Sequence, residues 1–499
     1  MTSSISRIEQ PELFFGFVSP IGADVKGALR SFGNYLNGQG YRVVEIKVTD
    51  IFTSLAKYHA PDKPLVRTPQ YDRYKSHIAY GNQIRRNFGD EVLASTSIIR
   101  IIRKRLKLGL PDPERFTKTA FLIHQFKRKE EIDLFRAVYG RLFFQISVYS
   151  RRGARVDAIS RAFASSRNSA LPHHYRSQAE AIVQIDENEI DELHGQRVAK
   201  IFHDADFLIN LDIAKSVQDQ VHRFCDLVFS SNSISPTKME YGMFLAKAAA
   251  LRTLDLSRQV GAAIFTPQGE VVSLGSNEVP KATGGTYWPD EEHDDREFRR
   301  AHDSNDGRKR EILSEILTLL GAEKSLEDVL KRADVRDSQF MDALEYGRIV
   351  HAEMSAICDA ARLGRSVKGS VLYCTTFPCH MCAKHIVASG LCEVVFLEPY
   401  PKSLASELHS DSIEIEGADR GRYQSFPSAR FSHFYGVTPR RYRELFERGK
   451  RKDDDGGFVH HGTGIARPFM EVKFPFYIQH ETQILREASG SLAAAAEAD

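Results

Sequence analysis

The chain lacks the features of a membrane protein and of a secreted disulfide scaffold. None of its apolar runs is long enough to span a bilayer, and its first residues do not have the pattern of a signal peptide. Six cysteines in 499 residues are too few for a disulfide framework, so a reducing compartment is expected. The formal net charge of +2 argues against a large nucleic-acid-binding surface and leaves free nucleotides open as ligands. We therefore expect a cytoplasmic protein without a membrane partner, with a length that suits two or three domains.

Two short motifs carry the residues with the clearest chemistry. His351-Ala-Glu353 is followed by Pro378-Cys379-His-Met-Cys382. His351, Cys379 and Cys382 are three ligands of the kind that zinc prefers, whereas a structural zinc site usually has four. A position left open at the metal takes water, and Glu353 would move protons there as a general acid and base. This pattern is typical of the zinc deaminases and predicts one catalytic Zn²⁺.

Each motif alone has other interpretations. Cys-x-x-Cys also occurs in redox sites and in structural zinc knuckles. The local pattern favours a catalytic site, because residues 351–363 predict a helix, 370–377 predict a buried strand, and Pro378 begins a second helix whose N-terminus favours thiolates. The remaining cysteines of this region lie in apolar contexts and are expected in the core: Cys358, Cys374 and Cys392.

The segment upstream of these motifs predicts further elements of the same domain. Residues 238–254 have helical spacing, and 260–265 with 270–274 predict a hairpin. This order of helix, hairpin, helix, strand, helix and strand resembles the core of the cytidine deaminase superfamily, a mixed sheet between helices. The resemblance implies a three-layer α/β/α domain in which Asn277 binds the sugar hydroxyl. The alternative is that Asn277 is only a turn residue.

Residues 249–262 resemble, more narrowly, the segment that enters the first strand of deoxycytidylate deaminases. An enzyme specific for nucleotides must bind phosphate, and guanidinium, amide and hydroxyl groups are suitable donors. In related enzymes residues 399–403 would lie near the nucleotide. Each such residue could instead be a solvated surface group. The predicted substrate-binding residues are Asn277, Arg252, Ser257, Arg258, Gln259, Lys281, Tyr400 and Lys402.

A long insertion, about 288–345, precedes His351. It begins with a charged run, and residues 311–320 and 326–330 within it have helical spacing. Some family members hold a second, structural zinc, for which His293 and His302 are the candidates here. We expect these two to be ordinary surface histidines and the chain to hold one zinc.

The N-terminal half predicts a second α/β domain. Strand, loop, helix and strand over residues 13–48 resemble the start of a P-loop kinase fold with its parallel sheet. A working P-loop needs Gly-Lys-Ser/Thr, and Ala23 and Asp24 stand in place of the last two residues. We therefore expect a degenerate loop without kinase chemistry that could still bind a regulatory nucleotide, with Mg²⁺ if it does. The predicted nucleotide contacts are Gly16, Gly22, Asp24, Arg151 and Arg152.

The two halves together resemble the bacterial anti-phage dCTP deaminases over nearly the whole chain. The predicted division is 1–225 for the P-loop-kinase-like regulatory domain, 236–485 for the deaminase domain and 486–499 for a disordered tail, and residues 469–479 predict a strand. The resemblance implies zinc-dependent deamination of dCTP to dUTP or of dCMP to dUMP, which would deplete dCTP on infection. It also implies a homo-oligomer, controlled by a nucleotide or by an RNA or protein inhibitor. The alternatives are a housekeeping dCMP deaminase that supplies dUMP, a polynucleotide cytidine deaminase and a catalytically dead scaffold.

Overall fold

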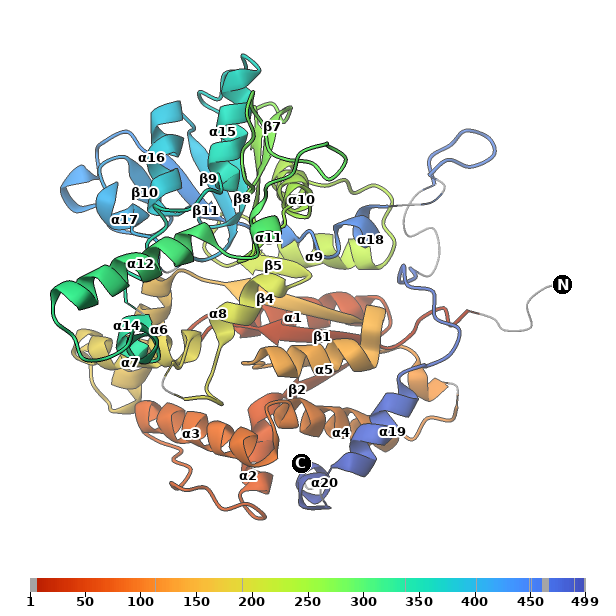
Figure 1. Cartoon of the computed structure of the whole chain (residues 1–499). Coiled ribbons are helices and arrows are strands. Elements are labelled where there is room, and N and C mark those ends of the chain that lie inside the picture. The colour runs from red at the N-terminus through yellow and green to blue at the C-terminus, as the bar shows by residue number, and fades with distance from the viewer. Residues whose placement is uncertain are drawn as a thin grey trace. The chain divides into compact units, whose positions relative to one another are not determined.

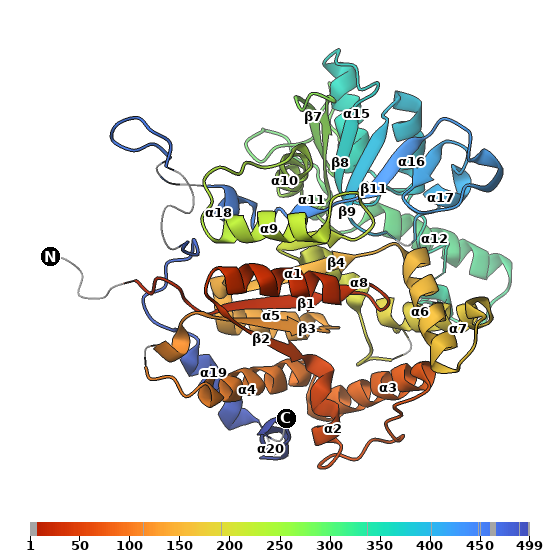
Figure 2. The same cartoon turned by 180° about the vertical axis from the view of Figure 1, so that it is seen from behind.

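The computed structural model describes residues 7–112, 114–190, 192–336, 338–400, 402–447, 449, 451–459, 466–488 and 490–497. The chain divides into two compact units, the first made of Met1–Pro236 with Tyr435–Asp499 and the second of Thr237–Phe434. Each unit is built on one six-stranded sheet with helices packed against it (Figure 1, Figure 2). The predicted α/β class is therefore confirmed for both.

The sheet of the first unit is parallel except at one edge. Its strands lie in the order β12-β5-β4-β1-β3-β2, and only β12 runs antiparallel to its neighbour. Helices cover both faces, because Phe14 stacks on Tyr139 with 3.7 Å between ring centroids while Phe15 contacts Phe32 on the opposite face at 5.2 Å. The strands are β1 (Leu13–Val18), β2 (Arg42–Lys47), β3 (Thr119–His124), β4 (Phe143–Tyr149), β5 (Phe207–Asn210) and β12 (Gly436–Val437).

Helices connect the parallel strands of this unit. α1 and α9 pack against each other on one face, and α5 packs on the other. The loops that follow β1, β2 and β3 meet at the carboxyl edge of the sheet, the usual place for a ligand in α/β folds. The helices are α1 (Val25–Gly38), α2 (Phe52–Leu55), α3 (Gln70–Phe88), α4 (Val92–Lys107), α5 (Lys129–Tyr139), α6 (Arg152–Ser166), α7 (Arg176–Glu187), α8 (Val198–Ile201), α9 (Val217–Val228), α18 (Tyr442–Phe446), α19 (Ile478–Glu487) and α20 (Gly490–Glu497).

The C-terminal segment differs from its prediction. Residues 435–499 group with the first unit, although we assigned 236–485 to the deaminase domain. No strand forms within residues 469–477, and α19 begins at the end of that stretch. The reason is an ion triad in which Arg105 of α4 lies 2.7 Å from Glu481 of α19 and 2.8 Å from Glu12, all three side chains being buried. Long-range pairing of this kind decides the fold of the segment more than its local pattern does.

The tail is also more ordered than predicted. Residues 490–497 form α20, and Leu492 and Ala495 are buried where this helix packs on α4 and α2. The prediction of a disordered tail over 486–499 was wrong for this helix. Apolar residues three positions apart give the alanine-rich run one buried face.

The second unit contains a mixed sheet, as predicted, and its strands lie in the order β10-β11-β9-β8-β6-β7. The strands are β6 (Gly261–Phe265), β7 (Val271–Ser276), β8 (Val371–Thr376), β9 (Glu393–Glu398), β10 (Ile413–Ile415) and β11 (Ala429–His433). The helices are α10 (Lys238–Ala250), α11 (Glu297–Arg300), α12 (Ser304–Leu319), α13 (Leu326–Leu330), α14 (Ala333–Arg336), α15 (Ala352–Arg362), α16 (His380–Ser389) and α17 (Ala405–Leu408). α10 packs on one face of the sheet, and α15 and α16 pack on the other, which gives three layers.

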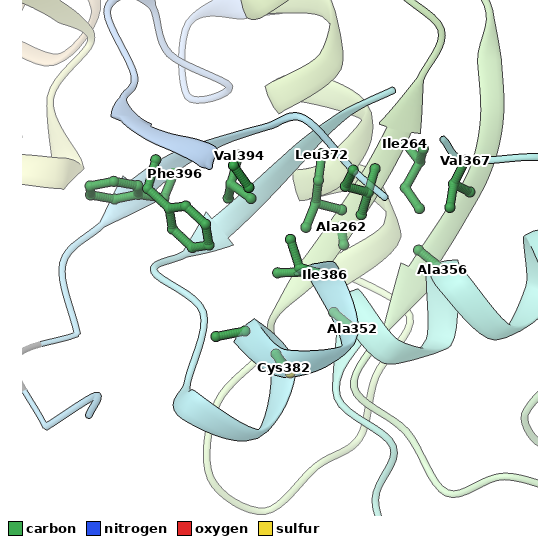
Figure 3. Packing of buried hydrophobic residues seen from close by; sticks show 14 of the residues in the cluster. Ala262, Ile264, Ala352, Ala356, Val367, Leu372, Cys382, Ile386, Val394 and Phe396 are labelled. Carbon is green, nitrogen blue, oxygen red and sulfur yellow. The ribbon is translucent and has the colours of Figure 1, made fainter. Parts of the chain in front are cut away.

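Small residues bring α15 close to the sheet. Figure 3 shows Ala352 and Ala356 of α15 among the buried apolar side chains of this layer, with Cys382 at the start of α16 nearby. A Cβ placed on Gly275 of β7 would lie 2.1 Å from the Ala352 carbonyl oxygen. Glycine at this position therefore lets the first turn of α15, which carries Glu353, lie directly on the sheet.

Candidate active site

The two motifs of the second unit meet at the N-terminal ends of two helices. His351 is the N-cap residue of α15, and Cys379 is the N-cap residue of α16. The Nδ1 atom of His351 lies 3.3 Å from Sγ of Cys379 and 3.4 Å from Sγ of Cys382. Ligands at ordinary zinc distances in a tetrahedron are about 3.5 Å apart, so these three side chains fit a zinc ion. All their candidate ligand atoms lie within 4.8 Å of one another.

The charges of this cluster also suit a cation. Hydrogen bonds to Cys382 and His351 lower the pKa of Cys379 to about 4, and the bond to Cys379 raises the pKa of His351 to about 9. The hydrogen bond with Cys379, and then burial, raise the pKa of Cys382. A divalent metal displaces protons from thiol ligands when it binds.

Glu353 lies beside the cluster and is buried, with 4% of its surface exposed. Its carboxylate is not part of the candidate metal-binding group formed by His351, Cys379 and Cys382. Burial, and then the charge of Cys379, raise its pKa. A carboxyl group whose pKa is moved toward neutrality can both accept and donate a proton, which is the property required of the predicted general acid and base.

A cavity of about 370 Å³ opens over these residues. His351, Glu353 and Cys379 are among the residues that line it. Five of the predicted substrate-binding residues line it: Asn277, Ser257, Arg258, Tyr400 and Lys402. The guanidinium of Arg258 lies 5.6 Å from the ring centroid of Tyr400 and 3.6 Å from Glu398. The structure therefore brings together a metal-ligand cluster, an acid and two cations.

Three other predicted contacts lie outside the lining of this cavity. Arg252 stacks on Trp288 at 3.6 Å and donates to the Tyr287 carbonyl oxygen, so it fastens the start of the insertion. Lys281 is paired with Glu291, and Gln259 donates to the Thr253 carbonyl oxygen. These partners give each side chain a structural role in the loops around the hairpin.

Asn277 lines the cavity but uses its amide within the protein. Its Oδ1 accepts from the backbone N–H of Val260 at 2.7 Å, and its Nδ2 donates to Asp255 and to the Arg258 carbonyl oxygen. Asp255 in turn accepts from Ser257. Asn277 thus joins the loop before β6 to the loop after β7, and its contact with a sugar hydroxyl stays a prediction.

Several cavity residues were missed by the sequence reasoning. Asp255, Thr376 and Phe377 lie beside the motifs and could have been found from proximity alone. Four more come from the insertion, which carried no motif: Lys309, Met341, Asp342 and Leu344. In the same insertion, the ring nitrogen Nδ1 of His302 lies 2.8 Å from the Arg300 carbonyl oxygen, and its role as a zinc ligand stays untested, as does that of His293.

The first unit has its own cavity, of about 220 Å³, at the carboxyl edge of its sheet. Gly22, with φ of +88°, lines it. Gly16 instead packs against Phe143, where a Cβ would lie 2.5 Å from the ring, and Asp24 caps α1. Arg151 and Arg152 are outside the lining and lie near Asp212 and Glu187.

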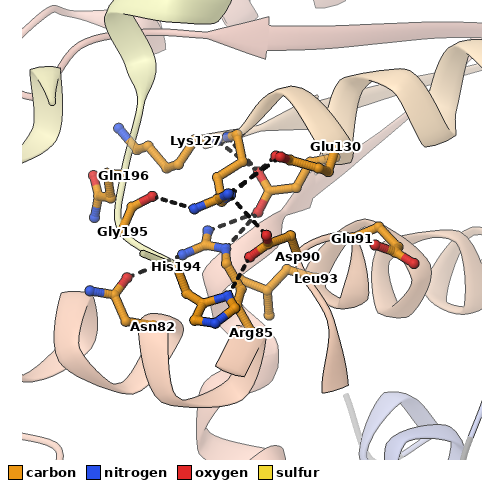
Figure 4. Close-up of polar contacts among 12 residues, drawn as sticks. Asn82, Arg85, Asp90, Glu91, Leu93, Lys127, Glu130, His194, Gly195 and Gln196 are labelled. Atoms are coloured by element: carbon orange, nitrogen blue, oxygen red, sulfur yellow. Dashed lines mark hydrogen bonds and ion pairs between the residues drawn. The ribbon is translucent and has the colours of Figure 1, made fainter. Parts of the chain in front are cut away.

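An internal carboxylate occupies the loop after β1. Asp186, which is buried, accepts from the Ile21 backbone N–H at 2.7 Å and from Lys127 at 2.6 Å. Figure 4 shows Lys127, Arg85 and Gln196 around the neighbouring polar network. All of these residues line the cavity, and Gln196 is 7% exposed.

Comparison with known proteins agrees with the site of the second unit. Residues 236–398 match the family model of the cytidine and deoxycytidylate deaminase zinc-binding region. The deoxycytidylate deaminase of Mus musculus is 28% identical over 179 residues, which cover 36% of this chain and 70% of that protein. The deoxycytidylate deaminase of Enterobacteria phage T2 is 46% identical over 54 residues, or 11% of this chain and 29% of that protein.

Among solved structures, the dCMP deaminase from the cyanophage S-TIM5 aligns with 40% of this chain and 99% of its own chain. The two are 15% identical over the aligned part, and the TM-score is 0.22. The sequence matches show that residues 236–398 are similar to the zinc-binding region of cytidine and deoxycytidylate deaminases. Within that class, the curated relatives quoted above are deoxycytidylate deaminases. Among the described residues, no helix is both long and apolar enough to cross a membrane.

Proposed function

We propose that the second unit hydrolyses the exocyclic amine of a deoxycytidine nucleotide, converting dCMP to dUMP, dCTP to dUTP, or both. The observation that carries this proposal is the buried carboxyl of Glu353 beside the three-ligand cluster, in a cavity that Arg258 and Lys402 also line. Support also comes from the relatives, which are deoxycytidylate deaminases. Zinc held by His351, Cys379 and Cys382 would supply a Lewis acid that lowers the pKa of water to about 7.

Glu353 would transfer the protons of this reaction. Its carboxylate takes one proton from the attacking water and gives it to the ring nitrogen N3 of cytosine. It then takes the second proton from the new hydroxyl group and gives it to the leaving amine. The carbon–nitrogen bond at C4 breaks, a carbonyl forms, and ammonia leaves, so that water and cytosine become uracil and ammonia. A single carboxyl can serve both directions because burial raises its pKa.

The side chains on the cavity wall would hold the nucleotide. Tyr400 and Phe377 offer aromatic surface to the base, while Arg258 and Lys402 offer charge to the phosphate. Ser257 and Asn277 lie near the same wall, where a sugar hydroxyl would replace part of the existing hydrogen bonding.

Control of the activity remains a proposal for the first unit. A regulatory nucleotide, with Mg²⁺ if its phosphates need it, would enter the cavity at the carboxyl edge of that sheet. Since Asp186 already fills the loop after β1, the ligand would contact Arg73, Gln125 and Gln196 more readily than Arg151 or Arg152. We also propose that an RNA or protein inhibitor controls the activity and that the protein is a homo-oligomer in the cytoplasm. Its role would be phage defence through loss of dCTP.

The substrate test is direct. Zinc-loaded protein is incubated separately with dCMP, dCTP, deoxycytidine and a single-stranded DNA oligonucleotide, and uracil products and ammonia are measured. We expect turnover of one or both nucleotides and little of the DNA. Turnover of DNA alone would contradict the proposal and favour a polynucleotide deaminase, and dCMP without dCTP would favour a housekeeping enzyme.

A further inference from the structure

The insertion between the hairpin and His351 forms one wall of the active-site cavity. Lys309 of α12 lines the cavity together with Met341, Asp342 and Leu344. Leu344 also packs against the hydrophobic core beneath α15 and α16. The insertion is therefore part of the candidate site. Its polar residues Lys309 and Asp342 line the same cavity as His351, Glu353 and Cys379.

Two side chains of helix α12 hydrogen-bond to the backbone of residues 341–346 in this wall. Asn305 and Lys309 lie one turn apart and so share a helix face. Asn305 donates to the Ala343 carbonyl oxygen at 2.8 Å and accepts from the Tyr346 backbone N–H at 3.1 Å. Lys309, which is 4% exposed, donates to the Met341 carbonyl oxygen at 2.6 Å. Asp342 is thus held between two anchored neighbours, and its place does not depend on its own side chain.

Asp342 is paired with a residue from another element. Its Oδ1 lies 2.6 Å from Nζ of Lys402, which follows β9. Both side chains line the cavity. Lys402 is one of the two cations that we assign to the substrate phosphate. Its ammonium group is already paired with the Asp342 carboxylate, at the place where a phosphate oxygen would bind. The lysine side chain is 54% exposed and that of Asp342 is 28% exposed, which leaves the pair open to exchange with a ligand.

The consequence follows from simple competition. A phosphate that approaches Lys402 must displace Asp342 and is repelled by its negative charge. Inorganic phosphate could use the charges of Lys402 and Arg258, but it has no base or sugar to add further contacts in the cavity. A nucleotide is also held by its base and sugar, so it can displace the carboxylate. The pair is partly exposed, and pairs of this kind change a binding constant by about two- to fivefold.

We propose that Asp342 competes with phosphate groups for Lys402, so that inorganic phosphate is held off at concentrations at which a nucleotide, bound also through its base and sugar, still occupies the cavity. This inference rests on the proposed nucleotide deaminase function. It gives the insertion a role in substrate selection, in which Asn305 and Lys309 position the carboxylate and Asp342 competes with the ligand.

The test compares Asp342→Asn with the parent protein in steady-state kinetics. We expect the KM for dCMP to fall about two- to fivefold with kcat little changed, and the inhibition constant of inorganic phosphate to fall by a similar factor. The KM for deoxycytidine, which has no phosphate, should not change. In a Lys402→Met background Asp342→Asn should have no further effect. Glu311→Gln is the matched control, because that carboxylate pairs with Arg308 on the same helix, both residues are outside the cavity lining, and the change should leave all ratios unchanged.

Two results would overturn the inference. Equal changes for dCMP and deoxycytidine would mean that Asp342 acts only on the shape of the wall. An effect that persists in the Lys402→Met background would mean that the pair is not the cause.

Binding separates failure of the inference from failure of the proposed function. Calorimetry on zinc-loaded Glu353→Gln protein measures dCMP, deoxycytidine and inorganic phosphate without turnover. If the parent protein deaminates none of the nucleotides but Asp342→Asn still strengthens dCMP and phosphate binding, the function fails and the inference stands. If Asp342→Asn leaves dCMP and phosphate binding unchanged, or if neither binds, the inference fails whether or not deamination is found.

Discussion

Nδ1 of His351 lies 3.3 Å from Sγ of Cys379, although 28 positions separate the two residues and each precedes a different helix. The contact exists because α15 and α16 lie side by side on one face of the sheet and begin at the same end. It places a metal-binding group where the helix N-termini favour negative charge. The buried acid Glu353 follows His351 by two residues, and the remaining predictions depend on this arrangement.

Replacing Glu353 by Gln should abolish turnover without removing the metal. The amide keeps the size of the side chain but cannot move protons, so kcat should fall about 10²- to 10⁴-fold. Zinc content should stay at the parental value, because the carboxylate is outside the ligand group. Assay of product and metal analysis on the same sample check this, with the exposed Glu407→Gln as control. Parental activity in Glu353→Gln would remove the residue from the mechanism.

Replacing Cys379 by Ser should release the zinc. The other two ligands remain, but loss of a thiolate from a three-ligand site weakens the hold on zinc strongly. Metal analysis after dialysis should show much less than one zinc per chain, and activity should fall with it. Cys358→Ser should keep both, because Cys358 of α15 is exposed; the prediction that Cys358 and Cys392 lie in the core was wrong, whereas Cys374 is buried as expected. Full zinc content in Cys379→Ser would show that the cluster does not bind the metal.

A methyl group on Gly275 should displace the first turn of α15. The added Cβ would lie 2.1 Å from the Ala352 carbonyl oxygen, so the helix must shift, and we expect a loss of about 1–3 kcal/mol in unfolding free energy. Activity should fall about 10²-fold because Glu353 moves with the turn. Gly307→Ala in α12 is the control, since its nearest new contact is 3.9 Å. Chemical denaturation and assay at one temperature measure both effects, and parental values for Gly275→Ala would contradict the packing account.

Replacing Glu481 by Gln should weaken the packing of α19 on the rest of the first unit. The buried Arg105 would keep only one of its two carboxylate partners, and breaking a buried ion pair costs about 3–5 kcal/mol when no partner remains. We expect about half of that here. Urea unfolding followed by circular dichroism gives the value, and the exposed Glu487→Gln serves as control. A change below the error of the measurement would mean that the triad does not hold α19.

The parts of the structure that local pattern determines were predicted well. Cysteine and histidine spacing, helix starts and apolar strands placed the zinc cluster and Glu353, because these residues lie at the ends of elements with strong local signals. The insertion was different: Lys309 and Asp342 carry no motif, and only tertiary contacts bring them to the cavity.

Contacts across the chain account for the errors as well. The segment 469–479 alternates like a strand, yet Glu481 reaches Arg105, far back in the chain, and a helix forms from residue 478. Arg252 was chosen for its charge; it contacts Trp288 and the Tyr287 carbonyl oxygen, and its role in binding the substrate stays a prediction. Sequence alone does not show which partner a charged group finds.

The most direct test of the central claim follows the oxygen atom of water. Zinc-loaded protein is incubated with dCMP or dCTP in water enriched in ¹⁸O, and the products are analysed by mass spectrometry together with the released ammonia. We predict one ¹⁸O as the carbonyl oxygen on C4 of each uracil nucleotide and one ammonia for each, with both formed at least about 10²-fold more slowly by Glu353→Gln. Absence of uracil products from both nucleotides, or products without the label, would contradict hydrolytic deamination at this site.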